Sequence, residues 1–330
     1  MKRTCAWMVA GVLLLGVAAE AAMWAAPVAR GSRGGGMPFV GELSLGVVNG
    51  EAKEHVYDYE GFRGARRRLS RLDWELKNVA MGGGSLSVRP FVAQQNLLNR
   101  LSVNGGMWIA LTEGSGEMED YDWMSTGSAD WTHYSLSKVD VKEGYIFDIN
   151  VGVDLWAEQS FALKALAGYK QNGWLWKDRG VYLLYPENGY IPQYLNGEHG
   201  IKYEQEFRMP YLGATVSWAQ RDWAVEGYLA WSPLVSATDW DDHVARGLHF
   251  KESFKKGDMM GFGVELRYEL VRMGLRNWFA TAAVDYQKID HILGDLSVVV
   301  LETGERDSED DIAGIENNWL TVSIGAGLRF

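Results

Sequence analysis

The sequence predicts an all-β fold, a transmembrane antiparallel β-barrel of about ten strands with long extracellular loops. Three observations predict it: apolar and polar residues alternate along most segments, an export signal precedes them, and the chain ends in an aromatic residue. Over residues 319–330 the even positions are apolar, and the odd positions after Trp319 are small or polar, up to Phe330. Side chains two apart share one face of a strand, so one face meets lipid and the other a polar lumen. A soluble β-sandwich also alternates, but the export signal and the aromatic end favour the barrel.

Residues 1–21 have the pattern of a secretory signal peptide. Lys2 and Arg3 precede an apolar run over 6–19, and small residues flank Glu20 before a plausible cleavage point. The single cysteine, Cys5, lies in this segment, so the mature chain can form no internal disulfide. Residues 22–38 include a glycine-rich stretch and are expected to be a flexible leader. The barrel domain is therefore expected over 39–330.

Composition excludes several classes of protein. The formal charge of −11 disfavours nucleic-acid binding, because phosphates require clustered Lys and Arg, and it suits a cationic partner instead. With 7 prolines against 39 glycines and 15 tryptophans, the chain is unlike a two-domain α/β enzyme. After the signal, no apolar run reaches the roughly 18 residues that a transmembrane helix needs.

Turn signals divide the barrel domain into successive predicted strands. These cover 39–57, 69–88, 97–118, 131–156, 161–177, 200–219, 223–238, 250–271, 277–291 and 313–330. The short links at 157–159, 220–222 and 273–275 are predicted periplasmic turns. The longer polar stretches at 58–68, 119–130, 178–199, 239–249 and 292–312 are predicted extracellular loops.

Two acidic segments carry the candidate chemistry. Asp120 and Asp122 are two residues apart, as are Asp241 and His243, so each pair shares a strand face. A neutral imidazole can take a proton from an attacking water, and a neighbouring carboxylate fixes its tautomer and stabilises the resulting cation. Two close carboxylates do not both ionise readily and can share a proton. Both pairs fall at outer strand ends, where they can face each other across the barrel mouth.

Each feature also has a plainer interpretation. Acidic pairs on an outer loop are often solvated charges or bridge divalent ions to lipopolysaccharide, and a histidine on a loop is usually a surface residue. The remaining histidines are interpreted in that way: His55, His133, His199, His249 and His291. The mature chain has no cysteine nucleophile, and no His-Glu-x-x-His spacing indicates zinc, so no metal is expected.

The chain resembles the omptin family of outer-membrane endoproteases. The matching segments are 42–46, 53–57, 70–74, 118–124, 207–213, 239–243 and 313–316. The resemblance implies an endopeptidase in the outer membrane of a Gram-negative bacterium, with its site facing outside. It implies catalysis by Asp120 and Asp122 facing Asp241 and His243, without an acyl-enzyme. It also places Glu54, Asp239 and Met118 at the substrate, with Arg or Lys before the cleaved bond.

Two departures from the family pattern limit these implications. His133 stands where an acidic residue would bind a basic side chain after the cleaved bond. In the family's lipopolysaccharide site Tyr169 is kept, but Gln171, Gly173 and Glu206 replace charged residues, and the sequence leaves open whether other basic residues such as Lys170 or Arg208 serve instead. Lipopolysaccharide is the expected lipid partner, no other cofactor is expected, and the chain is expected to be a monomer. The rival function is a non-enzymatic barrel, an adhesin or a small pore.

Overall fold

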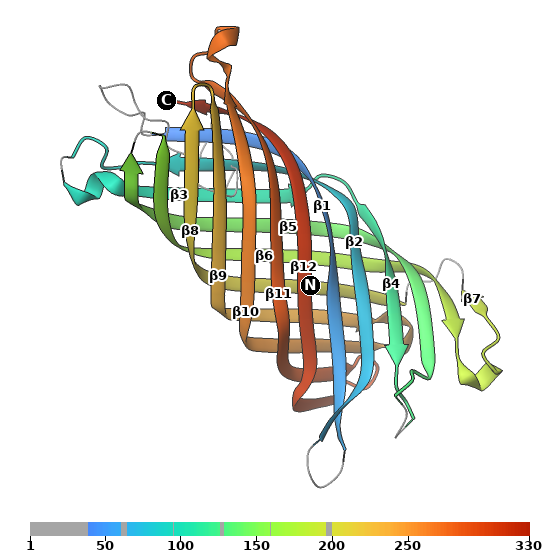
Figure 1. The fold of residues 1–330 in the computed structure, drawn as a ribbon. Helices are drawn as coiled ribbons and strands as arrows, with labels where there is room; N and C mark the ends of the chain where they lie inside the picture. Colours follow the sequence, from blue (N-terminus) through green and yellow to red (C-terminus); the bar gives the residue numbers. More distant parts are fainter. Residues whose placement is uncertain (1–38, 61–64, 95, 126–128, 159, 196–199) are drawn as a thin grey trace.

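The computed structural model describes residues 39–330 apart from 61–64, 95, 126–128, 159 and 196–199. The predicted signal (1–21) and leader (22–38) lie outside the described residues. The described residues form one antiparallel sheet that closes into a barrel (Figure 1). Among them there is no helix long and apolar enough to cross a bilayer.

The sheet contains twelve described strands, which form a ring of ten positions. The strands are β1 (Phe39–Glu60), β2 (Ala65–Val88), β3 (Leu101–Ala110), β4 (Gly114–Asp122), β5 (His133–Glu158), β6 (Phe161–Leu184), β7 (Gln193–Leu195), β8 (Ile201–Gln220), β9 (Trp223–His243), β10 (Leu248–Glu269), β11 (Trp278–Val300) and β12 (Arg306–Arg329). Both β3 and β4 pair with β2 on one side and β5 on the other, so together they fill one position. β7 pairs with β6 alone, in a loop, and β1 pairs with β12 to close the ring. The predicted barrel of about ten strands is confirmed.

Some predicted strand limits are wrong. The single strand expected over 97–118 begins as the 3₁₀ turn η1 (Leu97–Arg100), is interrupted at 111–113, and continues to Asp122. The stretches 239–243 and 292–300 were expected in loops but belong to β9 and β11. Residues 239–243 are polar apart from Trp240, and residues 292–300 mix apolar and polar residues without strict alternation, so no period of two marks either stretch. The backbone ladder continues regardless, because its hydrogen bonds need no apolar side chain.

A belt of exposed apolar side chains surrounds one part of the barrel. It includes Leu43, Leu45 and Val47 on β1, Leu229, Trp231 and Leu234 on β9, Met260, Phe262 and Val264 on β10, and Leu320, Val322 and Ile324 on β12. Beyond this belt the outward positions turn polar, as at Lys53 of β1 and Lys288 of β11. Only the belt suits hydrocarbon. The outer strand ends, with both acidic segments, therefore extend beyond the membrane-spanning part.

Large side chains fill the barrel below those outer ends. Trp74, Trp176 and Tyr203 are almost wholly buried, and their ring centroids lie 4.9 to 6.1 Å apart. Lys170 lies over the Trp319 ring at 4.8 Å, also inside. This packed interior supports the residues above it and argues against the small-pore alternative.

Candidate active site

Asp120 and Asp122 occupy the outer end of β4, on the face that points into the barrel mouth. Their strand lies between β2 and β5, and each neighbour contributes a serine to Asp120. Ser70 Oγ donates to Asp120 at 3.3 Å and Ser135 Oγ donates to it at 3.5 Å. One carboxylate of the pair is thus held in place from both sides.

Asp241 and His243 lie at the outer end of β9, as the i, i+2 spacing predicts. The His243 Nε2 and Asp241 Oδ2 atoms are 2.6 Å apart, and Asp241 is only 2% exposed. The Phe250 ring packs edge-on against the imidazole at 5.1 Å. Carboxylate and aromatic ring together fix the orientation of the histidine.

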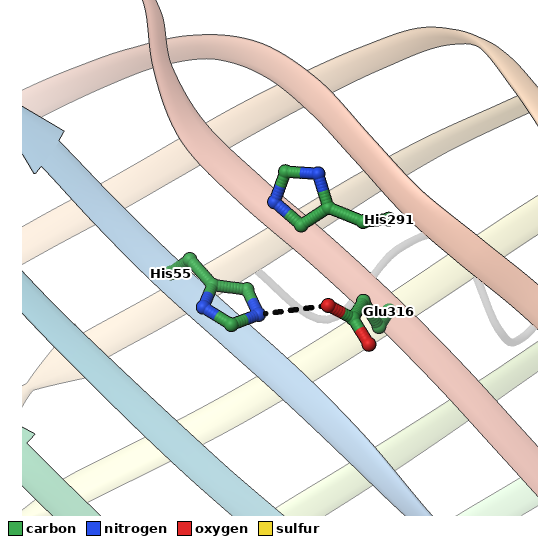
Figure 2. A group of neighbouring side chains, drawn as sticks. All are labelled: His55, His291 and Glu316. Carbon is green, nitrogen blue, oxygen red and sulfur yellow. Dashed lines mark hydrogen bonds and ion pairs between the residues drawn. The ribbon is translucent and has the colours of Figure 1, made fainter. Parts of the chain in front are cut away.

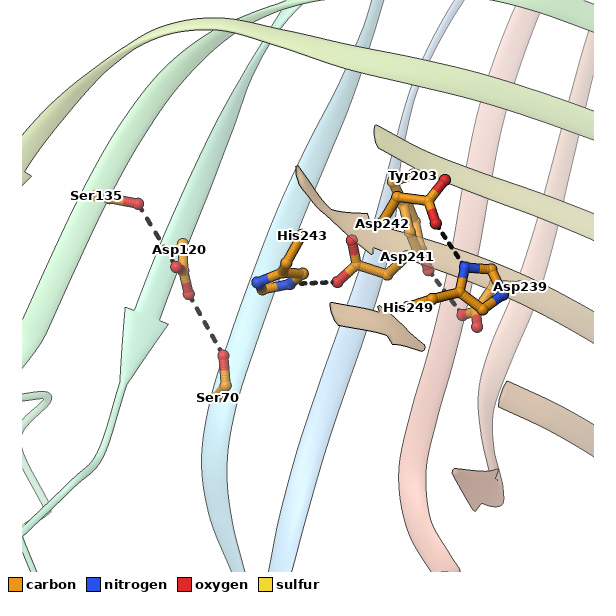
Figure 3. Close-up of polar contacts among 9 residues, drawn as sticks. All are labelled: Ser70, Asp120, Ser135, Tyr203, Asp239, Asp241, Asp242, His243 and His249. Carbon is orange, nitrogen blue, oxygen red and sulfur yellow. Dashed lines mark hydrogen bonds and ion pairs between the residues drawn. The ribbon is translucent and has the colours of Figure 1, made fainter. Parts of the chain in front are cut away.

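The two pairs come from strands that are not neighbours in the ring. β4 and β9 are separated by β2, β1, β12, β11 and β10 on one side and by β5, β6 and β8 on the other. Figure 3 shows the His243 imidazole between Asp241 and Asp120. Burial and the charge of Asp122 raise the pKa of Asp120, and a charge on His243 opposes this rise, as expected of an imidazole that faces the carboxylate. The expected face-to-face arrangement of the two pairs is therefore present.

Burial raises the proton affinity of these carboxylates. It raises the pKa of Asp120 to about 7, and the neighbouring Asp122 adds to the effect. Burial also raises the pKa of Asp122 and of Asp241. Near neutral pH the Asp120 and Asp122 pair can therefore hold a shared proton beside the imidazole.

A second group of carboxylates lies beneath the mouth, toward the packed interior. Glu54 is 3% exposed, Asp239 0% and Glu252 1%. Tyr203 donates to Asp239 Oδ2 at 2.9 Å, and Gln205 donates to the tyrosine hydroxyl at 2.7 Å. Asp239 and Glu252 interact with each other, and none of Glu54, Asp239 and Glu252 forms an ion pair with a basic side chain among the described residues. Their carboxylate oxygens can accept hydrogen bonds from a ligand.

The electrostatics of this acidic pocket favour a cation. Burial raises the pKa of Asp239 to about 7. It also raises the pKa of Glu54 well above its usual range, and the charges of Asp241 and Asp239 add to the effect. For Glu252 the causes are burial and then the charge of Asp239. Three buried carboxyls without a basic partner are stabilised in their charged form by an arriving cation.

Glu252 was not predicted as a site residue. It lies in β10 directly opposite Asp239, and the sequence placed it inside an ordinary strand. Glu252 shares one face of the strand with Phe250 and Phe254, so an acidic residue lies among apolar ones. This was the feature of the sequence that could have identified it as a site residue.

Met118 is 1% exposed and lies beside Asp120 on the inward face of β4, opposite Trp74. It forms part of the apolar floor of the mouth.

The comparison with known proteins agrees with this geometry. The Omptin family model matches residues 38–330. The chain belongs to the omptin family. It is 30% identical over 294 residues to the plasminogen activator of Yersinia pestis and 29% identical over 297 residues to protease 7 of Escherichia coli strain K12. Each alignment covers 88% of this chain and 89% of the relative.

A solved structure shares the fold. The crystal structure of the outer membrane protease OmpT from Escherichia coli superposes with a TM-score of 0.81 at 26% identity, and the match covers 89% of this chain and 97% of that one. This omptin is an outer-membrane endoprotease. The expected family, fold and activity are confirmed.

The barrel rim of this omptin near His133 carries an acidic side chain that the local sequence did not indicate. His133 Nε2 lies 2.9 Å from Glu187 Oε1, and the Thr132 hydroxyl contacts the other ring nitrogen at 2.9 Å. Glu187 belongs to the 3₁₀ turn η2 (Pro186–Asn188), which follows β6. A carboxylate from another loop therefore lies where the sequence shows only a histidine. His133 and Glu187 are 54 residues apart in the sequence, so residue spacing could not predict their contact.

The outer wall of this omptin also departs from the expected lipid contacts. Lys170 is buried in the barrel, so its proposal as an alternative lipid contact is wrong. Gln171 donates to the Tyr145 hydroxyl at 2.9 Å, and Tyr145 donates to Glu206 at 3.2 Å. A side chain at Gly173 would meet the Tyr145 ring at 2.5 Å. The Tyr145 ring thus occupies the space beside Gly173, where the family pattern has a charged residue.

Proposed function

We propose that this omptin cleaves peptide bonds after Arg or Lys by attack of a water molecule activated by His243. The observation that carries the proposal is the Asp241–His243 contact of 2.6 Å aimed at Asp120 across the barrel mouth (Figure 3). Neutral His243 takes a proton from the water as it attacks the carbonyl carbon, and the Asp241 carboxylate stabilises the imidazolium. The proton then passes to the leaving amine.

Asp120 and Asp122 act on the opposite side of the water. The serine hydroxyls of Ser70 and Ser135 hold Asp120, so the carboxylate can position the water by accepting one of its hydrogen bonds. A proton shared by the pair can be donated to the developing oxyanion of the tetrahedral intermediate. The raised pKa of Asp120, about 7, supports this shared proton near neutral pH. No covalent intermediate with the enzyme is required.

The acidic pocket selects the residue before the cleaved bond. Glu54 and Asp239, with Glu252 beside them, offer buried carboxylate oxygens that form no ion pair with a basic side chain among the described residues. An Arg or Lys side chain gains charge-assisted hydrogen bonds there that a neutral side chain does not. Met118 contributes apolar contact for the stem of that side chain. The substrates are therefore peptides and proteins with accessible basic residues.

The acidic pocket, the Asp120 and Asp122 pair and the Asp241 and His243 pair all come from one chain, which supports a monomer as the active unit.

We also propose that lipopolysaccharide contacts the outer wall around Tyr169, and that Arg208 supplies the basic contact. Arg208 is ion-paired with Glu206, and its side chain remains 43% exposed. Activity is expected to need no other cofactor.

The direct test is cleavage of an internally quenched Arg-containing peptide by purified protein supplemented with lipopolysaccharide, followed by mapping of the cut. His243→Ala and Asp120→Ala are expected to abolish most turnover. Asp242→Asn is the matched control, because Asp242 lies between the dyad residues but bonds to His249 at 2.5 Å on the other face of β9. Equal loss in the control would contradict the assignment of the site.

A further inference from the structure

A second cluster of metal-binding side chains lies on the outer face of the barrel wall. His55 of β1, His291 of β11 and Glu316 of β12 each offer a ligand atom, and these atoms all lie within 4.8 Å of one another (Figure 2). His55 Nε2 is 3.2 Å from Glu316 Oε1, and the two imidazole centroids are 5.1 Å apart. The three residues come from adjacent strands, so no sequence motif announces them.

A β-bulge directs His291 toward this cluster. In the pairing of β11 with β12, Ile289 faces Asn317 and Ile292 faces Ile315, so two residues lie opposite Glu316 alone. Ile289 and Ile292 are both buried, whereas Asp290 and His291 between them are both exposed. The extra residue breaks the alternation and turns the imidazole outward. Bulges commonly re-aim a side chain in this way.

The space between the ligand atoms is kept open by Gly314. A Cβ atom at this position would lie 2.6 Å from His291 Nε2 and 3.1 Å from the Cβ of His55. Any other residue would therefore push the two histidines apart. His55 is 2% exposed, so its ring is fixed by packing. The Tyr57 hydroxyl contacts His291 Nε2 at 2.8 Å and so helps to orient the imidazole ring.

We propose that His55, His291 and Glu316 bind one divalent ion of the first transition series, of the zinc class. Two neutral imidazoles and one carboxylate are a typical ligand set for such an ion and leave a position for water. Calcium and magnesium prefer all-oxygen sites, so they are excluded as the preferred ion. Of the nearby cations, Arg66 lies over the rings of Tyr57 and Tyr59, Arg68 lies over the Trp123 ring, and Lys53 pairs with Glu51.

The bound ion would tie β1, β12 and β11 together beyond the lipid belt. Glu54 precedes His55 in β1 and points into the barrel, so the ion lies on the opposite face of the wall from the acidic pocket. It is thus outside the proposed catalytic centre and takes no part in the chemical step. Its effect is to fix the outer strand segment that carries Glu54.

The test is Zn²⁺ binding to the purified, folded protein in detergent, by competition with a chromophoric chelator, with Co²⁺ absorption as a second readout. All proteins carry His243→Ala, so that the catalytic histidine cannot supply a site. One tight equivalent is expected, and His291→Gln or Glu316→Gln should weaken it by at least about tenfold. Heat-modifiable migration of the variants verifies that each barrel is folded.

His249→Gln is the matched control, because His249 also pairs with a carboxylate but lacks a second histidine. It should bind Zn²⁺ as tightly as the parent protein, and the Co²⁺ absorption spectrum should change when either His55 or His291 is replaced but not when His249 is. The proposal is overturned if the parent binds no equivalent, or if folded His291→Gln binds Zn²⁺ as tightly as the parent does.

Discussion

Replacing a pocket carboxylate by its amide should selectively weaken cleavage after a cation. Glu54→Gln and Asp239→Asn each remove one charge and keep the side-chain shape. Both carboxylates are at least 97% buried, so solvent screens them little. A hydrogen bond to a charged group contributes about 1.5–3 kcal/mol, so we expect each substitution to weaken the preference for a cation by about 1–3 kcal/mol. The ratio of kcat/KM for an Arg substrate to that for a citrulline substrate should then fall by about 5- to 150-fold.

The same ratio should depend on pH, because the pocket must be ionised to attract a cation. Burial raises the pKa of Asp239 to about 7, so its carboxyl is mostly protonated below this value and mostly charged above it. Neither arginine nor citrulline titrates in this range. The Arg-to-citrulline ratio should therefore rise with pH between about 6 and 8, and the rise should be smaller in Asp239→Asn.

Paired peptides that differ only in arginine or citrulline before the cleaved bond measure this ratio directly. Comparing the two substrates at each pH cancels effects of pH on the catalytic step itself. Asp242→Asn should leave the ratio unchanged, because that carboxylate bonds to His249 on the outer face. A ratio near one in the parent protein, or an equal fall in the Asp242 variant, would refute the pocket assignment.

Four further outcomes are expected. His243→Ala and Asp120→Ala should each lower kcat by at least about a hundredfold, and a folded variant that cleaves within a few-fold of the parent contradicts the assigned roles. Burial and then Asp239 raise the pKa of Glu252, so its favourable contribution to stability is full below the usual value of 4.5 and is lost as pH rises. Glu252→Gln should therefore raise the unfolding temperature more at about pH 8 than at about pH 5, and the reverse order would sink this argument. Deleting Phe330 should lower outer-membrane abundance, measured on intact cells, because its ring stacks on Phe39 at the seam of the barrel. In a peptide library, residues after the cut should be accepted broadly, and Glu187→Gln should remove any remaining basic preference; a strict basic requirement that survives this change would point to another acid.

The alternation of apolar and polar residues correctly predicted the strands inside the membrane. It did not predict how far those strands extend beyond the lipid. Along β12 the apolar side chains of Leu320, Val322 and Ile324 face outward, so strand and face were both predictable. At 239–243 the strand has left the membrane, and neither face needs to be apolar. The sequence there is indistinguishable from a polar loop, although β9 continues to His243. The strands inside the apolar belt could thus be predicted from the sequence, whereas the length of the strands outside the belt could not.

Contacts within one strand were predictable, and contacts between strands mostly were not. The Asp241–His243 pair follows from the period of two alone. The pairing of Glu252 with Asp239 depends on the register of β10 against β9, and that of His133 with Glu187 on a long loop. One-residue changes of register move every side chain to the other face. The family resemblance supplied part of this missing information, but not for residues particular to this chain.

The strand ladder explains why the acidic pocket persists despite its own repulsion. Glu54 lies opposite Ile315 on one side and Leu72 on the other, and Asp239 lies between Glu252 and Gln205. Turning either carboxylate into solvent would require breaking the ladder on both sides. The fold therefore keeps the carboxyls buried and raises their pKa values instead. A cationic side chain relieves this repulsion on entry, so a substrate analogue ending in a guanidinium should also stabilise the barrel against unfolding, and more strongly as the pH rises.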